Sequence, residues 1–183
     1  MSDDVVVAVD DEQVHRSQEL YYAALYDLRV NCEYIRLYRA HLSKWLTRIA
    51  VVRGVASSGG IGAWVIWRDY AFVWGSIIAL SQVADALKDA IPYTARHKAA
   101  NDLLNGLNAL FIEALFEWEG VFAAQFPIED IVDRRCKLMQ RQHDLDIKCF
   151  PAGDLPFRAD LQKVADDIAK DYLEGMFGKG DSA

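Results

Sequence analysis

The chain has 183 residues, of which 52% are hydrophobic and 26% are charged. This balance excludes a disordered chain and a protein that lies mostly within a membrane, but it fits a helical bundle or a protein that is part soluble and part lipid-facing. The net charge of −7 excludes nucleic acid as an expected partner, because affinity for phosphate backbones comes mainly from clustered Lys and Arg.

The N-terminal third predicts a loose start followed by one long helix. Residues 1–16 are acidic and lack helical periodicity, so we expect them to be loose. From Ser17 to Arg53 no Gly or Pro interrupts the chain, and apolar residues recur at alternating steps of four and three. The stripe comprises Tyr21, Leu25, Leu28, Cys32, Ile35, Arg39, Leu42, Leu46 and Ile49, of which Arg39 is charged.

Residues 49–87 predict a hydrophobic helical hairpin with a polar tip at Arg68 and Asp69. Its first arm is rich in glycine, and each glycine costs about 1 kcal/mol relative to Ala in a soluble helix. Small residues at this density favour close helix–helix packing inside a membrane. The expected packing residues are Gly54, Gly59, Gly60, Gly62, Ser57, Ser58 and Ser76. The expected interfacial anchors around the tip are Trp64, Trp67, Tyr70 and Trp74.

The arms of this hairpin are short, since residues 54–67 and 70–84 lie between charged residues and a full span takes about 20 apolar residues. Insertion is therefore expected to be marginal. Basic residues are more frequent at the base of the hairpin than at its tip. By the positive-inside rule, this predicts an inner-membrane protein with both termini in the cytoplasm. A cytoplasmic protein with the hairpin buried in its core is the alternative.

A second long helix is expected after Pro92, with a stripe that matches the first helix and allows antiparallel pairing with it. The stripe comprises Ala100, Leu104, Leu107, Phe111, Ala114, Trp118 and Val121. Residues 17–126 would then form a helical stalk that carries the hairpin. A charge in the stripe costs stability unless it finds a carboxylate, so Arg39 either pairs with Glu113 or Glu117 and fixes the register, or points to solvent.

The C-terminal part predicts two shorter helices within a subdomain at 127–177. Pro127 marks the start of the first, which runs from Ile128 towards Lys148. The last helix places Leu161, Val164, Ala165, Ile168, Tyr172 and Met176 on one face. Residues 178–183 form a tail that is disordered by composition. The whole chain is therefore expected to be all-α.

No catalytic or cofactor motif supports an enzyme, so we expect neither catalytic residues nor a cofactor. His143 and Asp146 share a helical face near Asp144, but a metal site needs more converging ligands, and no metal is expected. The three cysteines lack a CxxC spacing, which indicates reduced, structural thiols.

The layout of residues 17–121 resembles the SLATT family, small two-transmembrane proteins associated with bacterial nucleotide-signalling defence systems. The similar pattern in the second long helix, which opens ARHKAANDLLNGLNAL, consists of Ala95, His97, Ala100, Leu104 and Leu107. The resemblance implies a membrane effector that oligomerises when triggered and perforates or depolarises the inner membrane. The glycine-rich first arm and its Arg53 depart from an uninterrupted span.

The partners expected from this resemblance are further copies of the chain, the lipid bilayer, and a sensor or signalling protein of the same system. The alternative function is a soluble all-α homo-oligomeric interaction module in which the hairpin lies in the core.

Overall fold

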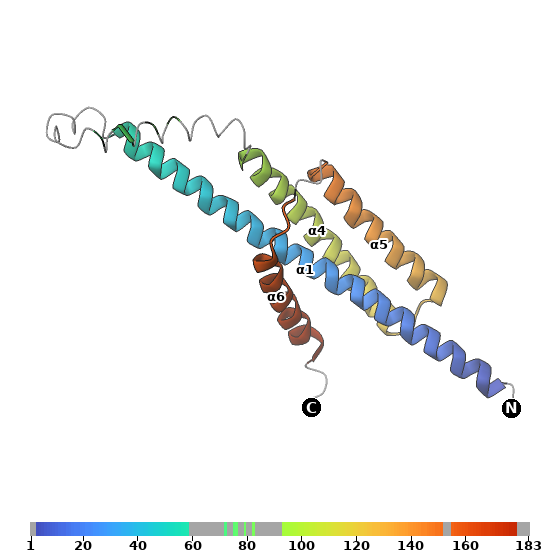
Figure 1. Ribbon diagram of the computed structural model, residues 1–183. Helices are drawn as coiled ribbons and strands as arrows, with labels where there is room; N and C mark the ends of the chain where they lie inside the picture. The colour runs from blue at the N-terminus through green and yellow to red at the C-terminus, as the bar shows by residue number, and fades with distance from the viewer. Residues whose placement is uncertain are drawn as a thin grey trace. The chain divides into compact units, whose positions relative to one another are not determined.

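The computed structural model describes residues 3–58, 72, 75, 76, 79, 82, 93–151 and 155–178. This part of the chain contains the helices α1 (Asp3–Ser58), α4 (Tyr93–Phe122), α5 (Ile128–Cys149) and α6 (Ala159–Phe177) (Figure 1). No strand occurs among these described residues. The all-α prediction is confirmed.

The chain divides into two compact units. Unit 1 comprises residues 1–38 and 99–183, and unit 2 comprises residues 39–98. Helices α1 and α4 each contribute to both units. Unit 1 contains the predicted C-terminal subdomain, and unit 2 contains the predicted hairpin, most of which lies outside the described residues.

Helix α1 is longer than the sequence pattern predicts. It covers 56 residues and begins at Asp3, not near Ser17, so the acidic segment that we expected to be loose is helical from Asp3. The backbone meets no Gly or Pro until Gly54, so no helix-breaking residue separates the acidic segment from the predicted helix. The helix continues through Gly54 to Ser58, so the first part of the predicted hairpin arm is continuous with α1.

The core of unit 1 is built on the two predicted stripes. Of the α1 stripe, Tyr21, Leu25, Leu28, Cys32 and Ile35 are buried in unit 1, and all seven predicted residues of the α4 stripe are buried. The two helices run antiparallel within unit 1, as two contacts show. The Gln18 side-chain amide donates to the Val121 carbonyl at 2.8 Å, and the Tyr21 hydroxyl donates to the Ala114 carbonyl at 3.3 Å.

Helix α1 is also buried on faces outside its stripe. Val30 and Tyr34 are 5% exposed, although neither belongs to the predicted stripe. The Tyr34 hydroxyl donates to the Pro156 carbonyl at 2.6 Å and accepts from the Arg158 amide at 3.1 Å. In unit 1, α1 is therefore enclosed by α4 and by the C-terminal part of the chain, and a single stripe underestimates its contacts.

Helix α5 begins directly after Pro127, as predicted, and runs antiparallel to α4. Glu129 and Asp130 in its first turn and Lys148 in its last turn interact favourably with the helix dipole. The turn that precedes it places Ala124 at φ 50°, in the left-handed region that more often holds glycine. This turn reverses the chain, so that α5 lies alongside α4 (Figure 1).

Helix α6 packs through a face that differs from the predicted one. Its buried residues are Ala165, Ala169 and Leu173. Of the residues predicted to share the apolar face, only Ala165 is buried, whereas Val164 and Met176 are 45% and 43% exposed. Small alanine side chains allow the α6 backbone to approach its neighbours closely, so Val164 and Met176 lie at the edges of the contact, while Leu173 is buried within it.

Candidate functional site

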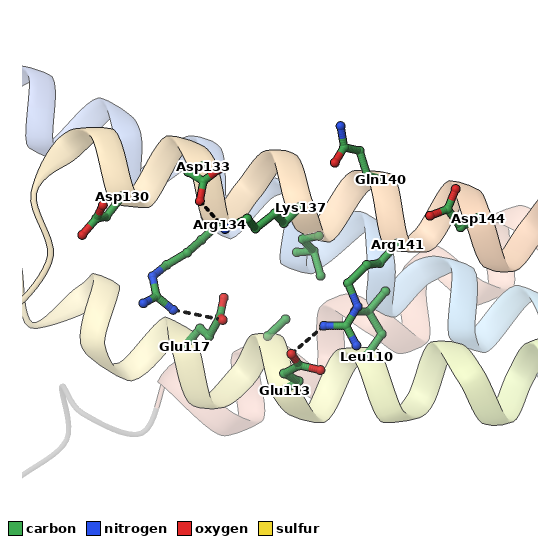
Figure 2. Close-up of a pocket in the computed structure, with 12 residues that line it drawn as sticks. Leu110, Glu113, Glu117, Asp130, Asp133, Arg134, Lys137, Gln140, Arg141 and Asp144 are labelled. Atoms are coloured by element: carbon green, nitrogen blue, oxygen red, sulfur yellow. Dashed lines mark hydrogen bonds and ion pairs between the residues drawn. The ribbon is translucent and has the colours of Figure 1, made fainter.

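A charged groove of about 470 Å³ lies between α4 and α5, and we call it the α4–α5 groove (Figure 2). Its charged lining residues are Glu113, Glu117, Asp130, Asp133, Arg134, Lys137, Arg141 and Asp144. Glu113 and Glu117, which the sequence placed near Arg39, point into this groove from α4 (Figure 2).

The charges of the α4–α5 groove pair with one another. Arg134 Nη1 lies 3.0 Å from Glu117 Oε1, and Arg141 Nη1 lies 2.5 Å from Glu113 Oε1. The hydrogen bond from Arg141 holds the pKa of Glu113 below its usual value. These two ion pairs lie one helical turn apart on α4, and both connect α4 to α5.

Glu117 connects three helices. Its Oε2 accepts a hydrogen bond of 3.0 Å from the Tyr21 hydroxyl of α1, while its Oε1 faces Arg134 of α5. Burial, followed by the Glu117 charge, raises the pKa of Tyr21, which keeps the hydroxyl protonated and able to donate. Glu117 is thus a structural acceptor in unit 1, a role that its position in the sequence did not reveal.

A second groove, of about 660 Å³, lies between α1 and α5, and we call it the α1–α5 groove. Leu20, Met139 and His143 are among its lining residues, together with two carboxylates, Asp27 and Asp146. Burial raises the pKa of both carboxyl groups, and the nearby charge of Asp166 raises that of Asp27 further. The groove is therefore a place where carboxylates are less well solvated than usual.

The sequence predicts no metal site at His143, Asp144 and Asp146. His143 and Asp146 both line the α1–α5 groove, whereas Asp144 lines the α4–α5 groove. Within the part of the chain that the structure describes, no three His, Cys, Asp or Glu side chains are grouped so that they could hold a metal ion.

The described cysteines are free thiols, and burial raises the pKa of Cys32 to about 12.

An ion pair lies inside the core of unit 1. The side chain of Glu33 is 2% exposed, and its Oε1 lies 2.6 Å from Nη2 of Arg29, one helical turn earlier. The Arg29 guanidinium lies 3.9 Å from the centre of the Tyr172 ring and 5.2 Å from that of Phe111. Arg29 thus joins α1 to α6 and α4. The sequence contains only an ordinary i, i+4 pair here, and this signal does not distinguish a buried pair from a solvated one.

A basic and aromatic cluster lies on α1 in unit 2. The indole N–H of Trp45 donates to Nε2 of His41 at 3.0 Å, and the Arg48 guanidinium lies 5.5 Å from the Trp45 ring centre. Trp45 is 43% exposed. The sequence pattern singled out the tryptophans of the hairpin tip and did not single out this one, because it lies outside the apolar segment.

Most of the predicted hairpin site lies outside the described residues: Gly59, Gly60, Gly62, Trp64, Trp67, Tyr70 and Trp74. Gly54, Ser57 and Ser58 belong to the last turns of α1, where Gly54 is exposed and a Cβ on it would meet nothing within 4 Å. The Ser76 hydroxyl donates to the Phe72 carbonyl at 2.9 Å.

No helix of the described residues combines the length and the apolar character needed to cross a membrane. Arg39 belongs to unit 2, and the described partners of Glu113 and Glu117 lie on α5 and α1. The register role of Arg39 and the packing and anchoring roles of the hairpin stay predictions.

No protein-family model, no curated protein and no solved structure matches this chain.

Proposed function

We propose that the protein is an oligomerising membrane effector. In this proposal, unit 1 is an acidic helical body in the cytoplasm, and the hairpin at residues 49–87 of unit 2 enters the inner membrane from the cytoplasmic side. The partners are the bilayer and further copies of the chain.

The observation that carries the proposal is the separation of charge between the two units. Residues 39–98 hold eight Lys and Arg against three Asp and no Glu. The rest of the chain holds 12 Lys and Arg against 24 Asp and Glu. Basic residues that flank an apolar segment favour its insertion with the basic ends on the cytoplasmic side, whereas an acidic body is repelled by an anionic leaflet.

The described residues of the second hairpin arm are consistent with contacts outside the chain. Phe72 is 88% exposed, and Gly75, Ala79 and Gln82, at helical spacing from it, are exposed too. The Ser76 hydroxyl is satisfied by a carbonyl of its own helix, which lowers the cost of placing it in an apolar environment. Lipid or a neighbouring hairpin would cover such a face.

Assembly follows from the short arms. A hairpin that is marginal for insertion alone becomes more stable when neighbouring helices satisfy its polar groups. The glycine-rich first arm would pack hairpin against hairpin, with the serines turned to neighbours or to a conduit. The resemblance to the SLATT family extends this proposal to an effector of a bacterial defence system, which a sensor or signalling partner triggers and which depolarises the membrane.

Expression in bacteria with fractionation, alkaline carbonate extraction and a membrane-potential dye tests this function. We expect the wild-type chain in the carbonate-resistant membrane fraction and a loss of membrane potential on expression. Trp67→Asp places a charge near the hairpin tip and should abolish both effects. Phe157→Asp is the matched control, since Phe157 is a 77% exposed aromatic of unit 1 and its replacement should change neither.

Two results would contradict the proposal. Recovery of the wild-type chain as a defined oligomer without detergent, with no change in membrane potential, would support the soluble interaction module instead. Equal behaviour of Trp67→Asp and the wild-type chain in both assays would show that the hairpin tip does not enter the bilayer.

A further inference from the structure

The cluster around Trp45 has a geometry that holds an aromatic ring at the protein surface. His41, Trp45 and Arg48 follow each other at steps of four and three, so they share one face of α1. The His41 hydrogen bond and the Arg48 cation–π contact hold the ring from the preceding and the following turn of α1, yet 43% of Trp45 stays exposed. Lys44 and Arg48 are exposed beside it.

This face differs from the apolar stripe of α1. The stripe residue Leu42 is 4% exposed, whereas Lys44, Trp45 and Arg48 are all exposed. Around a helix of 3.6 residues per turn, Lys44 and Arg48 lie roughly 160° and 120° from Leu42, whereas Trp45 lies about 60° from it, at the border of the stripe. The face around Trp45 is therefore available for a partner outside the chain.

The charge of the surrounding sequence selects an anionic partner. No acidic residue occurs between Glu33 and Asp69, a stretch that contains six Lys and Arg. The chain as a whole is acidic, with a net charge of −7, so attraction to an anionic surface must come from this local stretch. Such attraction weakens as salt is added, because exposed charges are screened.

The position of the cluster selects a membrane from among anionic partners. Trp45 precedes Ile49, where the predicted hairpin begins, by four residues on the same continuous helix, which corresponds to about 6 Å at 1.5 Å per residue. This distance is about the depth of the headgroup region on one side of a bilayer. Tryptophan is enriched at the boundary between lipid headgroups and acyl chains, and Lys and Arg next to it bind headgroup phosphates.

We propose that the face of α1 formed by His41, Lys44, Trp45 and Arg48 binds the anionic phospholipid headgroups of the cytoplasmic leaflet. This inference rests on the proposed function, and it names the class of lipid that the base of the hairpin recognises. Lys44 and Arg48 contact the phosphates, and Trp45 lies within the headgroup region.

Vesicle flotation with the full chain tests the inference. The vesicles contain either phosphatidylcholine alone or phosphatidylcholine and phosphatidylglycerol in equal parts, at low and high salt. Each basic residue near an anionic leaflet strengthens partition about fivefold. Lys44→Gln/Arg48→Gln should therefore weaken partition to anionic vesicles roughly 25-fold at low salt and leave partition to neutral vesicles unchanged.

The matched control is Lys163→Gln/Lys170→Gln, which removes two exposed basic residues from α6 in unit 1 and changes the net charge equally. We expect this variant to partition like the wild-type chain. Trp45→Gln should weaken partition to both kinds of vesicle, because the indole contributes without a charge. Circular dichroism verifies that all variants keep the wild-type helix content.

The inference is overturned if Lys44→Gln/Arg48→Gln and the control lose partition equally, or if neither loses it. It is also overturned if a single-stranded oligonucleotide binds more tightly than anionic vesicles and this binding is lost in the same variant. Carbonate-resistant insertion without a preference for anionic vesicles overturns this inference alone. Salt-sensitive binding to anionic vesicles without carbonate-resistant insertion overturns the proposed function and leaves the headgroup site standing.

Discussion

Glu33 shows how a single charged residue is accommodated in the interior of unit 1. Its carboxylate lies 2.6 Å from Arg29 and 3.0 Å from Arg36 Nε, while its side chain is 2% exposed. Removing two charges from water is costly, and only close pairing offsets that cost. Cation–π contacts with the rings of Tyr172 and Phe111 stabilise the Arg29 guanidinium further.

Replacing Glu33 alone should therefore destabilise unit 1 strongly. Glu33→Gln leaves the Arg29 charge buried without its carboxylate, and we expect a loss of about 3 kcal/mol in the free energy of unfolding. Denaturant unfolding followed by circular dichroism measures this loss. The double variant Arg29→Met/Glu33→Leu should recover most of it, because an apolar pair of similar volume leaves no buried charge unpaired.

Glu113→Gln serves as the control for this prediction. Glu113 and Arg141 are both about half exposed, with side-chain exposures of 50% and 53%, so their pair is well screened by solvent. We expect the replacement to cost less than about 1 kcal/mol. A cost for Glu33→Gln no larger than that for Glu113→Gln would contradict the role assigned to the buried pair.

At the scale of the elements, two glycines of α4 determine how closely α5 and its preceding turn approach. A Cβ at Gly120 would lie 2.5 Å from Cε2 of the Phe126 ring, and a Cβ at Gly106 would lie 2.8 Å from Cδ2 of Leu145. The Phe126 ring also lies under the Arg134 guanidinium, 4.1 Å from its centre, so a shift of the ring would disturb this contact. Close packing thus favours glycine at 120.

Gly120→Ala should destabilise the protein although alanine favours helix. Alanine gains about 1 kcal/mol in helix propensity, but overpacking against a fixed ring costs about 1–3 kcal/mol, so we expect a net loss of about 1 kcal/mol. Gly175→Ala on α6 is the matched control, because a Cβ there meets nothing within 4 Å. Thermal unfolding should show a higher midpoint for Gly175→Ala and a lower one for Gly120→Ala. Two shifts of the same sign would refute this account.

At the scale of the whole molecule, the core of unit 1 comes from two stretches of the chain that are far apart in sequence. Residues 1–38 supply Tyr21, Leu25, Leu28, Cys32 and Ile35, and residues from 99 onward supply the buried positions of α4, α5 and α6. Because α1 and α4 run antiparallel in unit 1, the ends at Tyr38 and Ala99 lie at the same end of the helix pair.

Replacing residues 39–98 by a short Gly- and Ser-rich linker should therefore leave unit 1 folded. We expect a helical protein that unfolds cooperatively, elutes without detergent, and is absent from the membrane fraction, since the basic and apolar stretch is removed. Circular dichroism, size-exclusion chromatography and fractionation measure these properties. A shortened chain that does not unfold cooperatively would show that unit 1 depends on unit 2 for its core.

The residues of the α4–α5 groove and the Trp45 cluster illustrate which site features a sequence pattern predicts. Glu113 and Glu117 are conspicuous as carboxylates on the predicted second helix, but their partners Arg134 and Arg141 belong to another helix. Trp45 and Arg48 lie one turn apart, so their contact follows from helix geometry alone. Contacts between charged or aromatic side chains on one helix were thus predictable in principle, whereas the ion pairs between side chains of different helices were not.

Helical periodicity and proline position are local properties, so the sequence predicted the helical character of the described residues, the start of α5, and which stripes of α1 and α4 form their contact. Only the folded structure reveals that Glu33 and Tyr34 are buried and that α6 packs through Ala165, Ala169 and Leu173. The burial of these residues depends on which helices from distant parts of the chain pack against them, because a helix face is buried only when another element covers it.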